Sequence, residues 1–331
     1  MNLKLFGKQF IIFFVIFTVL LVPVQFGWEQ FTNKRIFTGT ESLAENIDYL
    51  VDKDGPYYDL FKNSKRINIL VLGDNDKLTD TIMLASYDTE NQRVDIISVP
   101  RDTYYPRSKY KSAAAQKINA VYQNGGAVGA AKAVSEVLMG IPINYYAVIE
   151  FSDVEAIVDE IGGVPMNIPN ISNKGGMYYN DPYDTPPLKI AIPAGQQTLD
   201  GKHAVQFLRF RKGYPEGDIG RVKAQQEFIK SAMKQAIKSG LPGAVSLGLK
   251  TVDSDITLGM AAKIATKAVN LKSENMNTYL APGGPKTVNG ASYWFIDSKQ
   301  VGALIEEIYA DPDESSDEGN SGDNNKTESG S

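Results

Sequence analysis

Five charged side chains follow the ends of two predicted strands in the segment 67–106. Short β-branched runs bounded by turn residues predict strands at Ile67–Leu72, Ile82–Tyr87 and Val94–Val99. The first strand is followed by Asp74, Asp76 and Asp80, and the third by Arg101 and Asp102. If these two strands are parallel, the charges meet at one edge of a sheet. Carboxylates can hold a hard cation and a guanidinium can bind an oxyanion, so the pattern indicates phosphate chemistry.

Further cations come from separate loops along the chain. The cationic set comprises Arg101, Lys117, Arg209, Arg211 and Arg221. In an extended segment, Arg209 and Arg211 point to one face while Phe210 points into the core. Arg221 and Gln225 are four residues apart near the start of a predicted helix, so they share a face. A helix N-terminus with an arginine and an amide favours an anion.

Both groups of charges also have a simpler interpretation. Asp and Asn are ordinary turn residues, and the cations could be solvated charges that pair with neighbours such as Glu216 and Asp218. Magnesium takes one or two carboxylates and leaves its other positions to water and phosphates. Asp74, Asp76 and Asp80 therefore remain candidate metal ligands.

Composition excludes several classes of site. The 331 residues include no cysteine and a single histidine, His203. Thiolate nucleophiles, zinc–sulfur sites and a Ser-His-Asp triad are therefore not expected, and His203 is predicted to lie on a helix surface. The net charge of −5 belongs to the last 21 residues, without which the chain would carry about +1. A nearly balanced body lacks the basic face of a nucleic-acid-binding protein.

The two ends predict an anchored protein with an unfolded tail. Residues 1–9 would be a cytoplasmic N-terminus and residues 10–28 a transmembrane anchor, oriented by Lys4 and Lys8. A cleaved signal peptide is the alternative, but no small-residue cleavage site follows the apolar run. Residues 29–64 are interpreted as a stalk and 65–310 as the folded domain. The acidic stretch 311–331 has no apolar side chain for a core.

The elements that must position the charges alternate between strand and helix. Further predicted strands span Tyr145–Glu150, Val164–Ile168 and Leu188–Ile192, with a strand pair at Asn277–Ala281 and Tyr293–Ile296. Predicted helices span Gly126–Met139, 152–161, 200–207, Arg221–Lys238, Pro242–Val252, Ile256–Leu271 and Ser298–Tyr309. The second of these would begin with a capping box at Ser152–Glu155, and residues 169–187 would form a long loop. This order predicts a three-layer α-β-α sandwich around a mixed sheet.

Seven motifs in order resemble the LytR-CpsA-Psr family. They are Gly73…Thr79-Asp80-Thr81, Ser98–Thr103, Lys117–Ala120, Val158–Val164, Ala194-Gly195…Leu199-Asp200-Gly201, Arg209-Phe210-Arg211 and Asp218–Arg221…Gln225-Gln226. The resemblance covers about residues 67–229 and extends to the end through Val288–Trp294. It implies an enzyme outside the cytoplasmic membrane. Such an enzyme moves an anionic glycopolymer, such as a teichoic acid or capsule polymer, from a polyprenyl-pyrophosphate carrier to a peptidoglycan sugar hydroxyl, forming a phosphodiester.

The resemblance also implies roles for the charged residues. Arg101, Arg209, Arg211 and Arg221 would hold the pyrophosphate, supported by Lys117 and Gln225. Asp80, with Asp74 or Asp76, would hold magnesium or manganese, and Asp102 would orient Arg101 or act as a base. The carrier lipid would lie in an apolar tunnel between sheet and helices. Phosphoryl transfer relies on positioning and charge neutralisation, so arginines and a metal suffice without histidine or cysteine.

Two other functions remain open. Leu78 and Ala224 stand where the family has arginine, which favours a non-catalytic regulator or scaffold that binds polyprenyl-linked glycans. The same chemistry with water as acceptor would make the protein a polyprenyl-pyrophosphate hydrolase.

Overall fold

A computed structural model of the chain describes residues 54–75, 78–172, 174–182, 187–211, 213–239, 252–256, 264 and 271–310. Asp76, the anchor, most of the stalk, the acidic tail and nearly all of the predicted helices at 242–252 and 256–271 lie outside these residues. None of the described helices is long and apolar enough to cross a membrane.

The centre of the fold is a six-stranded mixed sheet with the order β10-β3-β2-β1-β4-β9. Its strands are β1 (Arg66–Asn75), β2 (Leu78–Asp88), β3 (Arg93–Ser98), β4 (Tyr145–Ile149), β9 (Asp253–Ser254) and β10 (Met276–Leu280). β2 is antiparallel to both β1 and β3, so β1 and β3 run in the same direction. β4 and β10 are parallel to them. The predicted first and third strands therefore run in the same direction, which was the condition for their charged residues to meet at one edge of the sheet.

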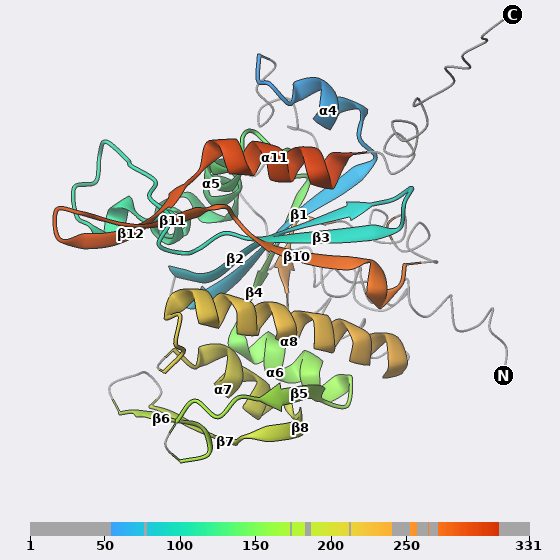
Figure 1. Cartoon of the computed structure of the whole chain (residues 1–331), viewed down its shortest axis with the longest axis vertical. Helices are drawn as coiled ribbons and strands as arrows, with labels where there is room; N and C mark the ends of the chain where they lie inside the picture. Colours follow the sequence, from blue (N-terminus) through green and yellow to red (C-terminus); the bar gives the residue numbers. More distant parts are fainter. Residues whose placement is uncertain are drawn as a thin grey trace, which may run out of the picture.

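Helices cover both faces of this sheet because its strands are apolar on both sides. Ile69 and Val71 of β1 join one hydrophobic cluster with α6 (Phe151–Glu160), α7 (Gly201–Arg209) and α8 (Asp218–Ser239). Leu70 and Leu72 join the other, with α4 (Tyr58–Asn63), α5 (Val121–Val137) and α11 (Ser298–Tyr309). Figure 1 shows α5 and α11 on one side of the sheet and α6, α7 and α8 on the other. The predicted helix–sheet–helix arrangement around a mixed sheet matches the described residues.

Two antiparallel strand pairs lie beyond α6 and α7 (Figure 1). They are β5 (Val164–Ile168) with β8 (Gly195–Leu199), and β6 (Gly176–Asp181) with β7 (Leu188–Pro193). The prediction of one long loop at 169–187 is wrong because β6 lies within it. Neither β6 nor β8 is rich in β-branched residues, and each owes its extended form to its pairing partner.

The last strands pair differently from the prediction. β10 joins the central sheet beside β3, while β12 (Ala291–Ile296) pairs with β11 (Gly283–Val288). Asn289 and Gly290 link β11 to β12 with φ of 50° and 78°. A two-residue Asn-Gly loop with positive φ at both positions is the favoured hairpin turn. The predicted pairing of Asn277–Ala281 with Tyr293–Ile296 is therefore wrong.

Helix starts also differ in detail. α6 begins at Phe151, and its capping box joins Glu150 and Asp153 rather than Ser152 and Glu155. α5 begins at Val121, after the 3-10 turns Ala114–Gln116 and Ile118–Ala120, and is kinked at Gly126, whose φ is 59°. A third 3-10 turn spans Ser273–Asn275. The predicted bounds of α11 and β5 are confirmed.

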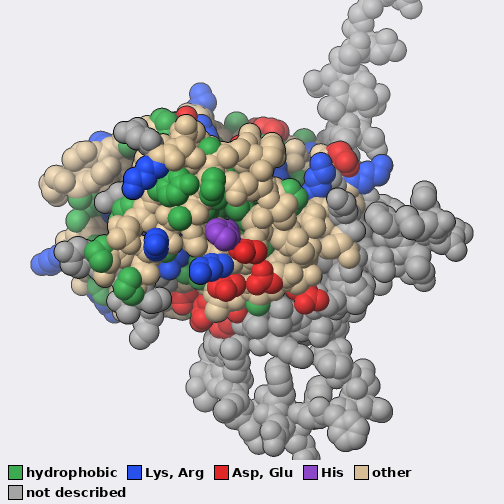
Figure 2. Space-filling model, turned by 90° about the horizontal axis from the view of Figure 1, so that it is seen from below, with side chains coloured by type: hydrophobic (Ala, Val, Ile, Leu, Met, Phe, Trp, Pro, Cys, Tyr) green, Lys and Arg blue, Asp and Glu red, His purple; other side chains and the backbone are tan. Residues whose placement is uncertain are grey.

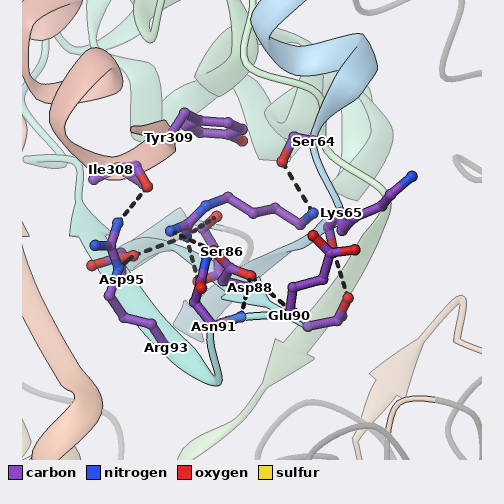
Figure 3. A network of polar contacts seen from close by, with 12 residues as sticks. Ser64, Lys65, Ser86, Asp88, Glu90, Asn91, Arg93, Asp95, Ile308 and Tyr309 are labelled. Carbon is purple, nitrogen blue, oxygen red and sulfur yellow. Dashed lines mark hydrogen bonds and ion pairs between the residues drawn. The ribbon is translucent and has the colours of Figure 1, made fainter. Parts of the chain in front are cut away.

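A buried polar network ties α11 to the sheet at the end opposite the site (Figure 3). Arg66 Nη1 lies 2.8 Å from Asp95 Oδ2, and Arg93 Nε lies 2.9 Å from the same oxygen. Arg93 donates to the Ile308 carbonyl, and the Arg66 guanidinium lies over the Tyr309 ring. Removing one member would leave buried charges with fewer partners, which is destabilising. The network therefore stabilises the amino ends of β1 and β3 and leaves their carboxyl ends for chemistry.

Candidate active site

A β-bulge aims Asp80 into a pocket. Gly73 lies opposite Thr81 and Asp74 opposite Thr79, so Asp80 is the extra residue of β2. In regular pleating, successive side chains would point to opposite faces of the sheet. Here both Asp80 and Thr81 line the same pocket. Bulges that redirect a side chain are common beside active sites.

The Asp80 carboxylate lies between two guanidinium groups. Its Oδ1 is 2.6 Å from Arg101 Nη1, and its Oδ2 accepts a hydrogen bond from Arg211 Nη2. On the other side of Arg101, Asp102 Oδ1 is 3.0 Å from Lys117 Nζ and 3.9 Å from Arg101 Nε. Asp80 lies at the start of β2 rather than in the predicted loop after β1, but it meets the loop after β3 as predicted. Arg101 therefore lies between two carboxylates.

α7 delivers the next two cations. Arg209 is the last residue of this helix, and Phe210 then continues in an extended conformation. Phe210 is 2% exposed, so it enters the core, while Arg209 and Arg211 both line the pocket. Arg209 is thus helical rather than extended as predicted, yet the two arginines share a site. Its guanidinium carbon lies 5.2 Å from the ring centroid of Phe151, at the start of α6.

α8 contributes two buried polar groups. Arg221 and Gln225 are 3% and 6% exposed, and both line the pocket from the first turns of the helix. Gly220 lets this helix start pack closely, because a Cβ there would lie 2.8 Å from Cβ of Tyr214. The residue after Gln225, Gln226, donates to Ser98 Oγ at 2.9 Å and to the Tyr279 carbonyl at 2.8 Å. These bonds fix α8 against β3 and β10.

The pocket is apolar inside and cationic at one part of its wall. Its carbon lining comes from β1, β2, β4, α6, α7 and α8, and comprises Val71, Met83, Ile149, Phe151, Val154, Ile157, Val158, Ile161, Leu208, Phe228, Ile229 and Ala232. Its polar lining comprises Asp80, Thr81, Arg209, Arg211, Arg221 and Gln225. Such a pocket can bury a hydrocarbon chain while several guanidinium groups bind the anionic head.

Sequence patterns marked Thr81 only as a motif residue without a role, and they did not single out Phe151. Strand alternation through Met83 places Thr81 on the pocket face, so the pattern of β2 could have identified it. Phe151 could not be found this way, because its contact with Arg209 joins two helices distant in the sequence. His203 lies on the molecular surface, as predicted, with its Nδ1 2.7 Å from Asp200 Oδ1. Figure 2 shows this single histidine beside acidic side chains.

The predicted metal ligands are only partly gathered. Asp80 lines the pocket, whereas Asp74 is not among the lining residues and Asp76 lies outside the described residues. Burial, together with the nearby carboxylates of Asp74, Asp253 and Glu150, raises the pKa of the Tyr122 phenol to about 12. Asp74 therefore lies near Tyr122. Within the described residues, no three His, Cys, Asp or Glu side chains are grouped to hold a metal ion. The single carboxylate of Asp80 fits an ion such as magnesium that takes its other ligands from phosphates and water.

The fold and the pocket define a mixed α/β protein that can hold an amphipathic anion. The LytR_cpsA_psr family model matches residues 35–309, and the chain belongs to this family. A relative from Oceanobacillus iheyensis, polyisoprenyl-teichoic acid–peptidoglycan teichoic acid transferase TagU, is 26% identical over 271 residues, which cover 78% of this chain and 79% of the relative.

Other comparisons agree on the family and the fold. Regulatory protein MsrR of Staphylococcus aureus (strain COL) is 33% identical over 183 residues, which cover 53% of this chain and 51% of MsrR. The solved structure of TagT bound to LIIa-WTA superposes with a TM-score of 0.60 at 22% identity, covering 73% of this chain and 89% of TagT. Lin1025 from Listeria innocua superposes with a TM-score of 0.55 at 24% identity, covering 74% and 97%. These structural likenesses concern the fold.

Proposed function

We propose that this protein is a membrane-anchored phosphotransferase that moves an anionic glycopolymer from a polyprenyl-pyrophosphate carrier to a peptidoglycan sugar hydroxyl. The observation that carries the proposal is the convergence of Arg209, Arg211 and Arg221 on one part of the wall of a largely apolar pocket. The apolar side chains of the pocket can pack against the hydrocarbon chain of the carrier, and the three guanidinium groups can bind its pyrophosphate. The transferase name of the TagU relative supports the same reaction class.

In this reaction the acceptor oxygen attacks the phosphorus nearer the sugar. The bond from that phosphorus to the bridging oxygen breaks, and polyprenyl phosphate leaves. Phosphoryl transfer is catalysed mainly by positioning and by neutralising the phosphate oxygens, which guanidinium groups can do. Arg101 would bind the phosphate that is attacked, the one nearer the sugar. The three pocket arginines would bind the rest of the pyrophosphate.

Asp102 is placed where it could act as the general base or orient Arg101. It lies between Arg101 and Lys117, so it can accept the proton of the attacking hydroxyl or fix the Arg101 guanidinium. Asp80 would hold magnesium or manganese together with phosphate oxygens, and the ion would add charge neutralisation at the phosphates. Asp74 and Asp76 remain proposed second ligands. The anchor at residues 10–28 would place the catalytic domain outside the cell membrane.

The full chain, purified in detergent, tests the proposal with a synthetic polyprenyl-pyrophosphate sugar, peptidoglycan and magnesium. Sugar joined to peptidoglycan is the expected product. Arg101→Ala should lower the rate by about 10²–10³, by analogy with loss of one oxyanion-hole donor, while the circular dichroism spectrum stays the same. Lys223→Ala, at an exposed ion pair with Glu216, is the matched control and should keep full activity.

A non-catalytic regulator is the second candidate, favoured by the name of the MsrR relative and by Leu78 and Ala224. In the same assay it would bind the lipid without converting it. Released sugar phosphate with no polymer on peptidoglycan would instead indicate a hydrolase. An Arg101→Ala variant as active as the wild type would contradict the proposed mechanism.

A further inference from the structure

An aromatic and basic surface adjoins the candidate active site. It is formed by the β11–β12 hairpin and the loop after β3, and we call its residues Tyr104, Lys117, Lys286, Tyr293 and Phe295 the hairpin surface. Figure 1 shows β11 and β12 extending away from the helix layers, at the end of the molecule to which β3 and β10 lead. The Trp294 amide donates to the Asp102 carbonyl at 2.9 Å, and the Tyr104 amide donates to the Trp294 carbonyl at 2.8 Å. The hairpin is thus bonded to the segment that carries Asp102.

The rings of this surface lie in mutual contact. Tyr104 stacks on Phe295 with centroids 4.8 Å apart and meets Tyr293 edge-on at 5.1 Å. Lys286 Nζ lies 5.2 Å from the Phe295 centroid, and Lys117 Nζ lies 5.9 Å from the Tyr293 centroid. Tyr104 and Phe295 are half-buried and Lys286 is exposed, so solvent reaches these two rings, whereas the Tyr293 ring is buried and supports them. Half-exposed rings held rigid by their neighbours offer contact area at little cost in side-chain entropy.

The two segments that build the surface are basic and have no acidic residue. Residues 103–117 contain four Lys or Arg and three Tyr, residues 283–296 contain one Lys, and neither segment contains Asp or Glu. Aromatic rings pack against the C–H faces of pyranose sugars, and ammonium groups donate to hydroxyl and carboxylate oxygens. The surface therefore suits a sugar chain that carries carboxylates.

The hairpin surface and the pocket contact the Arg101–Asp102 segment from different faces of the sheet, the first through Lys117 and the second through Asp80. The pocket lies among residues of the cluster that contains α6 and α8, whereas Ile296 and Ile118 beside the hairpin surface belong to the cluster that contains α5 and α11. Lys117 joins the surface to the reaction centre through its 3.0 Å contact with Asp102. In phosphoryl transfer the attacking oxygen and the leaving oxygen lie roughly in line on opposite sides of phosphorus. If the lipid-pyrophosphate donor occupies the pocket, the acceptor hydroxyl must therefore approach from the side of Asp102.

We propose that the hairpin surface binds the acceptor, a glycan strand of amino-sugar pyranoses bearing carboxylates, and presents its hydroxyl to the Asp102 side of the site. This inference rests on the proposed function for the role of the strand as acceptor. The binding itself can be measured without turnover.

Binding of soluble, uncross-linked peptidoglycan glycan strands to the full-length protein in detergent tests the proposal by isothermal titration calorimetry. Phe295→Leu keeps an apolar side chain but removes the ring, and should weaken binding about five- to tenfold. Phe295→Trp should restore it. Tyr58→Leu on α4 is the matched control, because Lys62 Nζ lies 5.7 Å from that ring far from the hairpin, and it should bind as the wild type does.

Kinetics then separate the two proposals. Phe295→Leu should raise the KM for the glycan strand and leave the affinity for the lipid-pyrophosphate donor unchanged. Equal glycan binding by Phe295→Leu and the wild type, or a loss of donor binding in place of glycan binding, would overturn the inference. Loss of glycan binding in a protein that joins no polymer to peptidoglycan would uphold the surface and refute the transferase.

Discussion

At the residue scale, the central feature of the site is one carboxylate shared by two arginines. Asp80 accepts from both Arg101 and Arg211, which approach from β3 and from the end of α7. Charge-assisted bonds of this kind hold guanidinium groups in a fixed orientation before substrate arrives. Asp80 can therefore serve both as an organiser of the arginines and as the proposed metal ligand.

Asp80→Asn should separate catalysis from binding. The amide keeps the size of the side chain but removes the negative charge beside the two guanidinium groups. We expect turnover to fall by about 10²–10³ while the affinity for the lipid-pyrophosphate donor is unchanged or higher. Steady-state kinetics and direct donor binding measure the two quantities. Glu216→Gln, at the exposed pair with Lys223, is the control, and wild-type turnover in Asp80→Asn would rule out both roles.

At the element scale, helix ends position the cations. α7 begins at an Asp200 cap, which accepts from the His203 amide at 2.8 Å, and ends at Arg209. The hydrogen bond from that amide holds the pKa of the Asp200 carboxyl below its ordinary value. Because the folded-state pKa is lowered, the cap contributes stability above the unfolded pKa of about 4 and loses it as the pH falls.

Asp200→Ala should lower the free energy of unfolding by about 1 kcal/mol, the usual cost of losing an N-cap. It should also reduce turnover, because α7 positions Arg209 and Arg211. Urea unfolding and kinetics measure the two effects. Asp297→Ala is the matched control, since Asp297 caps α11 by accepting from the Lys299 and Gln300 amides on the other side of the sheet. Equal effects of both substitutions on turnover would contradict a positioning role for α7.

At the scale of the whole molecule, several tyrosine phenols lie within the two hydrophobic clusters or beside the polar network of Arg66, Arg93 and Asp95. Burial raises the pKa of Tyr87, Tyr279 and Tyr309 to about 12 each. A phenol whose folded pKa exceeds its unfolded value of about 10 binds more protons in the folded state between these two values. Its contribution to stability is complete below about pH 10 and is lost as the pH rises toward about 12.

The free energy of unfolding should therefore fall progressively above about pH 10, and the ultraviolet absorbance of tyrosinate should show a fraction of phenols that ionise late. Tyr309→Phe should reduce the slope of stability against pH, because the half-buried Tyr309 ring lies against the Arg66 guanidinium and its hydroxyl accepts from Asn68 Nδ2 at 2.9 Å. Denaturant titrations across this pH range measure the slope. A flat profile with all tyrosines ionising together near pH 10 would refute the expectation.

Local patterns predicted most of the fold. β1, β2 and β3, α8 and α11 were identified within a few residues, because apolar alternation and capping residues act over one or two turns of chain. β6, β8 and β11 were missed, since these strands are polar or glycine-rich and are extended by their partners. The same limit applied to β10, whose place beside β3 depends on a pairing between residues about 180 apart in the sequence.

The sequence by itself determined the types and order of the charged groups, the absence of cysteine chemistry and the family pattern that runs from Gly73 to Gln226. Tertiary structure alone decided that Asp80 leaves the strand alternation at a bulge, that Asp74 lies near Tyr122 rather than in the pocket, and that the hairpin adjoins Asp102. The reason is physical. Residue type sets what a group can do, but which groups meet depends on strand register and helix packing between distant segments.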